Sequence, residues 1–392
     1  MKGMELSEIL KKYNATIRTV DEKQYFLVID FKEQEVCCKR KIEEIYHAIY
    51  QHFQEHQIQI FHERVFGENE YYEKVKDVRT ECVNRYFGKE AIPFTYVGAP
   101  VCNGHGLAGI NIMGIRDLEY PIKTVEYDGK VCGREWVNDD YSAVIINSVL
   151  NNEMEQDLVK NNLKVFENAA KILEHLQYTF TDVIRTWIYI PKILSQYDEF
   201  NVARNQFYKK LDLLNESLQT ENMVEQIYMP ASTGIGCLNP YSDSTIMDLY
   251  AVKKKGSSAV PDIYVESGKE QRSAYRYGAA FSRSIVVEEN NKKHIYLSGS
   301  ASIDETGATV NIGDIKAQIQ KVFEVIGALV GERGLVIEDA VEGTVFLKRP
   351  EYYEAYKDYI AEHNLKELPF ISCIADVCRD DLLFEIDAIF AK

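Results

Sequence analysis

Three polar residues lie in similar apolar runs at equal distances along the 392-residue chain. Asn111, Asp248 and Glu385 follow one another at intervals of 137 residues. A carboxylic acid can donate a proton and an amide cannot, and the aspartate side chain is one methylene shorter than that of glutamate. If the three positions are equivalent, only Glu385 has both the reach and the acidity of a proton donor. We therefore expect one specialised site.

The surroundings of Glu385 favour a role as a general acid. Phe384 and Ile386 flank it, and Leu382 and Leu383 precede it. Alternation along an extended strand places Glu385 on the face opposite Phe384 and Ile386. An apolar setting disfavours the charged carboxylate, so it raises the pKa and keeps a proton on the carboxyl near pH 7. The alternative is a structural glutamate paired with an arginine across the sheet.

Two glycine-containing segments are candidates for anion binding, because glycine lets backbone N–H groups approach a ligand closely. The first contains Thr233 and Gly234, and the second ends at Ala301. The eight cysteines and eight histidines show none of the spacings that are typical of a metal site. We therefore expect neither a metal nor a cofactor.

The elements that must position these residues recur three times. Each repeat has a strand, a long amphipathic helix, a second strand, an aromatic-rich helix, a proline-containing turn and a final strand. The turns contain Pro93, Pro230 and Pro369. The expected helices are 39–57, 70–87, 155–176, 197–211, 314–330 and 351–363, and the expected strands before them are 25–31, 58–66, 141–150, 183–190, 294–298 and 340–347.

A unit of this size cannot cover both faces of its sheet with two helices. Three units can instead surround a common axis, with the helices outside, and close one core. We predict an α+β fold of three units forming an intramolecular pseudo-trimer, with clefts between neighbouring units. The predicted units are 1–117, 118–255 and 256–392, with linkers at 116–131 and 253–271.

The second and third units resemble the Rid (YjgF-type) family in their element order and in the terminal strand Phe384-Glu-Ile-Asp-Ala-Ile-Phe-Ala391. The resemblance implies a chorismate-mutase-like fold for each unit. Many members hydrolyse reactive imines with an arginine in a Pro-Ala-Arg-Ser turn. Thr95, Ser232 and Ile371 occupy that place here, which argues against imine deamination.

A narrower resemblance, over about residues 135–392, is to the chorismatases, which consist of Rid-like units in one chain. It implies cleavage of the enolpyruvyl ether of chorismate to pyruvate and a dihydroxycyclohexadiene carboxylate or hydroxybenzoate. Residues 1–120 match more weakly, and residues 304–311 replace a Gly-His-containing stretch of the family, which leaves the ring product open. The matching blocks are Trp187-Ile-Tyr-Ile-Pro191, Tyr197 to Phe207, Pro230-Ala-Ser-Thr-Gly-Ile-Gly236, Tyr277-Gly-Ala-Ala-Phe-Ser-Arg283, Leu297-Ser-Gly-Ser-Ala-Ser-Ile303 and Ala375-Asp-Val-Cys-Arg-Asp-Asp-Leu-Leu-Phe-Glu385.

The resemblance also implies roles for single residues. Glu385 stands at the family's acid position and would protonate the methylene of the enol ether. Chorismate is a dianion and the protein has a net charge of −16, so we assign Arg204 and Arg283 to one carboxylate each; a surface ion pair is the alternative. Tyr197, seven residues before Arg204, would orient it or contact the substrate, or else lie in the core. Cys378 would line the pocket and shape it or assist proton transfer, or else be an inert buried thiol.

Composition excludes several classes of partner. The negative net charge disfavours nucleic acids. Residues 1–13 lack a signal-peptide core, and no run of about 18 apolar residues occurs. We therefore expect a cytoplasmic protein without membrane contact, whose partner is a small anionic substrate. Because the pseudo-trimer is closed within one chain, we also expect a monomer.

Three functions remain in competition. The first is a cofactor-independent hydrolase or lyase of the chorismatase type. The second is a Rid-like hydrolase of another small enamine or enol, which requires a carboxylate-binding arginine near Glu385, a place that Arg283 can fill. The third is a non-catalytic small-ligand-binding protein of the same fold. The presence of Glu385 with both arginines argues against the third.

Overall fold

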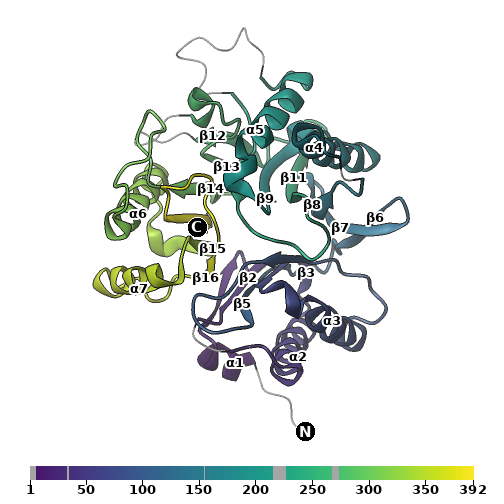
Figure 1. The fold of residues 1–392 in the computed structure, drawn as a ribbon. Coiled ribbons are helices and arrows are strands. Elements are labelled where there is room, and N and C mark those ends of the chain that lie inside the picture. Colours follow the sequence, from purple (N-terminus) through teal and green to yellow (C-terminus); the bar gives the residue numbers. More distant parts are fainter. Residues whose placement is uncertain (1–5, 33–34, 154, 215–226, 267–272) are drawn as a thin grey trace.

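Three mixed β-sheets surround a common axis, and the long helices lie on the outside (Figure 1). The computed structural model describes residues 6–32, 35–153, 155–214, 227–266 and 273–392. Each sheet packs two long helices against its outer face and turns its inner face toward the other two sheets. The prediction of an α+β pseudo-trimer within one chain is confirmed.

The first sheet has the strand order β1-β2-β5-β3-β4, with β3 and β4 parallel. Its outer face is covered by two helices whose apolar side chains recur at the helical period. The elements are α1 (Leu6–Lys12), β1 (Ala15–Val20), β2 (Gln24–Asp30), α2 (Lys39–Glu55), β3 (Gln59–Gly67), α3 (Tyr72–Tyr86), β4 (Thr95–Gly98) and β5 (Leu107–Ile115).

The second and third sheets repeat this order and add one strand at the edge. Their orders are β10-β9-β11-β8-β7-β6 and β12-β13-β14-β17-β15-β16. The second unit contains β6 (Lys123–Tyr127), β7 (Lys130–Val137), β8 (Tyr141–Leu150), α4 (Leu158–His175), β9 (Val183–Tyr189), α5 (Ile193–Lys210), β10 (Ala231–Ile235) and β11 (Ile246–Lys254). The third contains β12 (Asp262–Glu266), β13 (Ser284–Glu289), β14 (Lys292–Ala301), α6 (Ile315–Gly331), β15 (Ala340–Leu347), α7 (Tyr353–Glu362), β16 (Phe370–Ile374) and β17 (Phe384–Ala391).

The two segments expected to be linkers contain strands where the structure describes them; residues 267–271 of the second lie outside the described residues. The first contains β6 and the start of β7, and the second contains the end of β11 and all of β12. These edge strands were missed because β6 and β12 are short and bury at most one side chain fully, so they lack the apolar alternation by which a strand is recognised. Asp314 is the N-cap of α6, because its side chain accepts a hydrogen bond from the backbone N–H of Ala317.

The strand registers correct the expected equivalence of Asn111, Asp248 and Glu385. The strand pairs β3–β5, β9–β11 and β15–β17 occupy the same place in the three units, and each contains a β-bulge. Next to the bulge, His62 pairs with Met113, Arg185 with Tyr250, and Glu342 with Ile389. Two residues before the second member of each pair lie Asn111, Asp248 and Asp387, so Asp387 is the equivalent residue. Glu385 corresponds to Gly109 and Ile246. A shift of two residues keeps a side chain on the same face of a strand, so alternation did not reveal the error.

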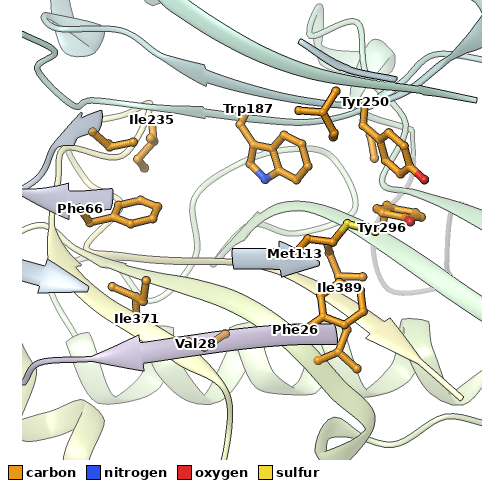
Figure 2. Packing of buried hydrophobic residues seen from close by; sticks show 14 of the residues in the cluster. Phe26, Val28, Phe66, Met113, Trp187, Ile235, Tyr250, Tyr296, Ile371 and Ile389 are labelled. Carbon is orange, nitrogen blue, oxygen red and sulfur yellow. The ribbon is translucent and has the colours of Figure 1, made fainter. Parts of the chain in front are cut away.

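The inner faces of the three sheets meet in one apolar core around the axis (Figure 2). Every unit contributes large side chains to this cluster: Phe26, Phe66 and Met113 come from the first, Trp187, Ile235 and Tyr250 from the second, and Tyr296, Ile371 and Ile389 from the third. Since no sheet covers its own inner face, we expect the units to depend on one another for stability.

Candidate functional site

A pocket lies at the boundary between the second and third units. Helix α5 and strand β10 form one wall, and β14, β17 and two connecting segments of the third unit form the other. Its volume is about 40 Å³. Its lining residues are Tyr197, Arg204, Ser232, Gly234, Tyr277, Phe281, Arg283, Gly299, Ala301, Ile303, Cys378, Arg379, Leu382 and Glu385. Of the residues predicted from sequence, Thr233 alone is not among them.

Glu385 reaches the pocket from β17, opposite Ala301 on β14. Gly299 leaves room for it, because a Cβ atom at this glycine would lie 2.9 Å from the carboxyl carbon of Glu385. Burial, followed by the negative charge of Asp387, raises the pKa of Glu385 to about 8, and the charges of Arg185 and Arg283 oppose this shift. The carboxyl is therefore largely protonated at neutral pH, as a proton donor requires.

The alternative of a glutamate paired with an arginine is not found among the described residues. Arg185 on β9 instead donates a hydrogen bond to Asp387 Oδ2 at 3.0 Å. Asp387 is thereby held beside Arg185, two residues from Glu385 and on the same face of β17. The two carboxyl groups thus have opposite surroundings, one paired with a cation and the other open to the pocket.

Both predicted arginines are buried, so the alternative of surface ion pairs is wrong. Arg204 is 2% exposed and Arg283 is 4% exposed. The Arg204 guanidinium donates a hydrogen bond to Asn201 Oδ1 at 2.6 Å, and its Nε has no hydrogen-bond partner in the described part of the chain. Both cations lie near the ring of Phe281, whose centroid is 5.3 Å from Arg204 Cζ and 5.5 Å from Arg283 Cζ. The unpartnered Nε of Arg204 can donate to an anion that enters the pocket.

Tyr197 and Cys378 lie beside one another at the pocket wall. Burial and the neighbouring Cys378 raise the pKa of Tyr197 well above its usual range. Burial and the charge of Glu385 raise the pKa of Cys378 to about 12. Both groups are therefore neutral hydrogen-bonding groups at pH 7, and Cys378 is not a thiolate nucleophile.

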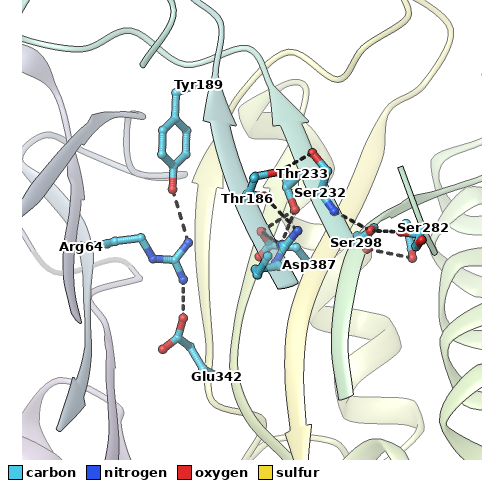
Figure 3. Close-up of polar contacts among 11 residues, drawn as sticks. Arg64, Thr186, Tyr189, Ser232, Thr233, Ser282, Ser298, Glu342 and Asp387 are labelled. Carbon is cyan, nitrogen blue, oxygen red and sulfur yellow. Dashed lines mark hydrogen bonds and ion pairs between the residues drawn. The ribbon is translucent and has the colours of Figure 1, made fainter. Parts of the chain in front are cut away.

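A buried polar network holds the two units together beneath the pocket (Figure 3). Thr233 belongs to this network: its hydroxyl donates to Asp387 at 2.8 Å and accepts from Arg185. The next link joins β10 to β14, where the backbone N–H of Ser232 donates to Ser298 Oγ at 2.7 Å. Thr233 thus contacts Arg185 and Asp387 and does not line the pocket.

A third arginine, Arg379, lies at the site and was not predicted from the sequence. It lines the pocket, and its guanidinium lies over the ring of Tyr277, with 5.6 Å between Arg379 Cζ and the ring centroid. Tyr277, Phe281 and Gly299 were also missed. Each of these residues lies within a sequence block that supports the chorismatase resemblance. Because the same blocks contain Arg283, Ala301 and Cys378, these residues could have been predicted as neighbours of the site.

Each boundary between units has such a pocket. Tyr72 and Arg79 of α3 line the pocket between the first and second units, and Tyr353 and Ile360 of α7 line the pocket between the third and first. In both pairs the residues are seven apart, as are Tyr197 and Arg204. At the first boundary Arg79 is already neutralised, because it forms an ion pair with Glu63 at 2.8 Å. Within the described part of the chain, Arg204 at the boundary between the second and third units differs from Arg79 in having no ion pair.

In the described ranges, no group of three or more His, Cys, Asp or Glu side chains is arranged to hold a metal ion. Among the same residues, no helix has the length and apolar character needed to cross a membrane.

Comparisons with known proteins agree with this architecture. The Endoribonuclease L-PSP family model matches residues 273–392. The 3-aminoacrylate deaminase RutC of Acinetobacter baylyi is 29% identical over 96 residues, which cover 24% of this chain and 76% of the relative. A RutC family protein of Pyrococcus abyssi is 35% identical over 105 residues, which cover 25% of this chain and 78% of the relative.

The crystal structure of a chorismatase superposes with a TM-score of 0.58 and 15% sequence identity, covering 96% of this chain and 99% of that chain. At this identity the match shows the fold, and it includes the first unit, where the sequence resemblance is weak. These similarities place the chain in the Rid family, together with RutC and the endoribonuclease L-PSP proteins, and give it the three-unit fold of a chorismatase.

Proposed function

We propose that this protein is a cofactor-independent hydrolase or lyase of the chorismatase type, which cleaves the enolpyruvyl ether of chorismate. The observation that carries the proposal is the meeting of one largely protonated carboxyl, Glu385, with three arginines in a single pocket. In a protein with a net charge of −16, such a local excess of cations suits a dianionic substrate.

In the proposed complex, the arginines bind the two carboxylates. Arg204 and Arg283 present planar guanidinium groups from opposite sides of the unit boundary, and each can bind a carboxylate through two hydrogen bonds. Arg379 adds a third positive charge at the same pocket. The pocket volume of about 40 Å³ holds only a few water molecules, so binding of a ring requires lining side chains such as Tyr277 to move outward.

The proposed reaction begins with proton transfer from Glu385 to the terminal methylene carbon of the enol ether. A C–H bond forms, the C=C π bond is lost, and the ether carbon becomes an oxocarbenium ion. Water then attacks this carbon, and Glu385 regains a proton from the attacking water. In the collapse of the resulting hemiketal, the hydroxyl loses its proton and forms the C=O bond of pyruvate, the bond to the ring oxygen breaks, and the ring oxygen takes up the proton to give a dihydroxycyclohexadiene carboxylate. Attack by a ring hydroxyl in place of water would lead to a hydroxybenzoate.

The test is to incubate the purified protein with chorismate and to measure pyruvate with lactate dehydrogenase. We expect pyruvate to form in proportion to the protein, and Glu385→Gln to abolish most of its formation. The matched control is Glu342→Gln, because Glu342 is a buried glutamate that pairs with Arg64 near the axis and lies outside the pocket. Absence of pyruvate with the folded wild-type protein would refute the proposal.

The similarity to a 3-aminoacrylate deaminase favours one second candidate, a Rid-like hydrolase of a small enamine. The site offers support for it, because Arg283 lies close enough to Glu385 for its charge to lower the pKa of that carboxyl. Ammonia release from 3-aminoacrylate, without pyruvate release from chorismate, would favour this candidate.

A further inference from the structure

The boundary between the third and first units has a pocket that the proposed function does not use. Its volume is about 320 Å³, far larger than that of the Glu385 pocket. Strand β2 of the first unit forms one wall, and α7 with the segment that leads to β16 forms the other. Asp30 is the one carboxyl among its lining residues in the described chain.

Asp30 occupies a position that corresponds to the Glu385 site. It lies on β2 opposite Gly109 on β5, whereas Ala301 on β14 lies opposite Glu385 on β17. Since the registers make Gly109 equivalent to Glu385, Asp30 is equivalent to Ala301. In both pockets one residue of this cross-strand pair carries a carboxyl group. In the Glu385 pocket it is the residue on β17, and in this pocket it is the residue on β2.

The Asp30 carboxyl is buried with weak partners. It is 3% exposed, and its hydrogen bonds, from Lys32 N, Ser372 N and Ser372 Oγ, are long, at 3.3 to 3.5 Å. No described cation forms an ion pair with it. Burial raises the pKa of Asp30 to about 7, against the charge of Lys32 and the hydrogen bonds from Ser372. The carboxyl therefore changes its charge within the physiological range.

Three other titratable groups that interact with Asp30 stay uncharged in this range. They are Tyr356 on α7, Cys102 in the segment before β5 and Cys373 on β16, and burial raises the pKa of each well above its usual range. The charge of Lys32 opposes the rise in the pKa of Asp30. Among Asp30, Tyr356, Cys102 and Cys373, Asp30 is accordingly the group whose charge changes between pH 6 and pH 8.5.

The remaining lining residues suggest the kind of ligand. Six of these residues have large apolar or aromatic side chains. The cationic residues of this pocket are lysines, whereas those of the Glu385 pocket are arginines. The apolar residues are Tyr353, Tyr356, Ile360, Leu365, Leu368 and Phe370, and the lysines are Lys32, Lys357 and Lys366. Such a pocket suits a ring that carries a carboxylate, with the ring among the apolar side chains and the carboxylate beside the lysines.

We propose that this pocket is a second ligand site, which takes a small aromatic or cyclic monocarboxylate and binds it when Asp30 is protonated. In the protonated state Asp30 adds no negative charge beside the ligand and can donate a hydrogen bond to an oxygen substituent of the ring. The ionised state repels the carboxylate. This site is separate from the Glu385 pocket and does not depend on the activity proposed there.

The probe is 4-fluorobenzoate, and its binding is measured by fluorine NMR at pH 6.0 and pH 8.5. Ala361 is an exposed residue of α7 that lines the pocket, so Ala361→Trp should fill the pocket without disturbing the core. We expect this variant to remove a binding component of the wild-type protein. That component should weaken at least about tenfold from pH 6.0 to pH 8.5.

Asp30→Asn is the matched variant, because the amide keeps the shape and cannot ionise. Its affinity for 4-fluorobenzoate should change less than about twofold between the two pH values. Binding that Ala361→Trp does not reduce would place the probe elsewhere and overturn the proposal. An equal loss of affinity at pH 8.5 in Asp30→Asn would show that Asp30 is not the responsible group.

Discussion

Glu385 and Asp387 lie on the same face of β17 and have opposite surroundings. Asp387 forms an ion pair with Arg185 at 3.0 Å, whereas burial and the charge of Asp387 raise the pKa of Glu385 to about 8. The separation of two residues keeps the carboxylate of Asp387 close enough to act on Glu385 while Arg185 and Thr233 hold it away from the pocket. Burial is thus the main cause of the raised pKa of Glu385, and the charge of Asp387 is the second.

Glu385→Gln should lower chorismate turnover by at least ~10²-fold and leave substrate binding in place. The amide keeps the shape and hydrogen bonding of the glutamic acid but has no transferable proton. Steady-state kinetics and calorimetry with an unreactive chorismate analogue measure the two effects. Near-normal turnover would remove Glu385 from the mechanism.

The pH dependence of turnover should report the pKa of Glu385. An acid acts in its protonated form, so activity should be present below pH 8 and fall as the pH rises through about 8. Asp387→Asn removes a charge that raises this pKa, so the fall should move to lower pH. Asp248→Asn is the matched control, because Asp248 is the equivalent residue of the second unit and lies at the boundary between the first and second units. An identical shift in both variants would contradict the role given to Asp387.

Arg204→Ala and Arg283→Ala should each weaken binding of a chorismate analogue by roughly 2 to 4 kcal/mol. Each removes a buried cation from the pocket, and a desolvated carboxylate would lose its charge-assisted partner. Arg116→Ala is the control for the change in net charge, because Arg116 is exposed. Calorimetry that shows unchanged affinity in both pocket variants would mean that the anion binds elsewhere.

Asn111→Ala and Asp248→Ala should preserve turnover but differ in stability. Neither amide atom of Asn111 has a hydrogen-bond partner among the described residues, so its removal should change the free energy of unfolding by less than about 1 kcal/mol. Asp248 accepts hydrogen bonds from Thr95, from the backbone of Ser148 and from His62. Its removal should cost roughly 3 kcal/mol. Urea denaturation measures both values, and equal costs would contradict this assignment of partners.

The protein should be a monomer that binds one chorismate analogue in the Glu385 pocket. The three sheets already close a common core within one chain, so no further copies are needed to complete it. Sedimentation equilibrium and calorimetric stoichiometry check the two expectations. A trimer of whole chains, or two or three equivalent analogue sites, would show that the functional cleft lies elsewhere.

The sequence was sufficient for the repeat and for most elements, because both depend on local pattern. The helical period of Ile42, Ile45, Ile49 and Phe53 predicted α2. The blocks that contain Arg204 and Glu385 indicated the unit boundary that holds the candidate site. The start of α5 was placed four residues too late, at 197, because helix ends depend on capping and packing more than on periodicity.

Only the tertiary structure decided the register and the composition of the pockets. Alternation has a period of two residues, so it could not distinguish Glu385 from Asp387 as the equivalent of Asp248; the intervals between the prolines, 137 and 139 residues, carried the correct offset. Arg185 and Asp387 are 202 positions apart, and Asp30 meets α7 across almost the whole chain. Contacts of that kind arise when three sheets close around one axis, because closure brings the first unit against the third, and no local pattern in the sequence records it.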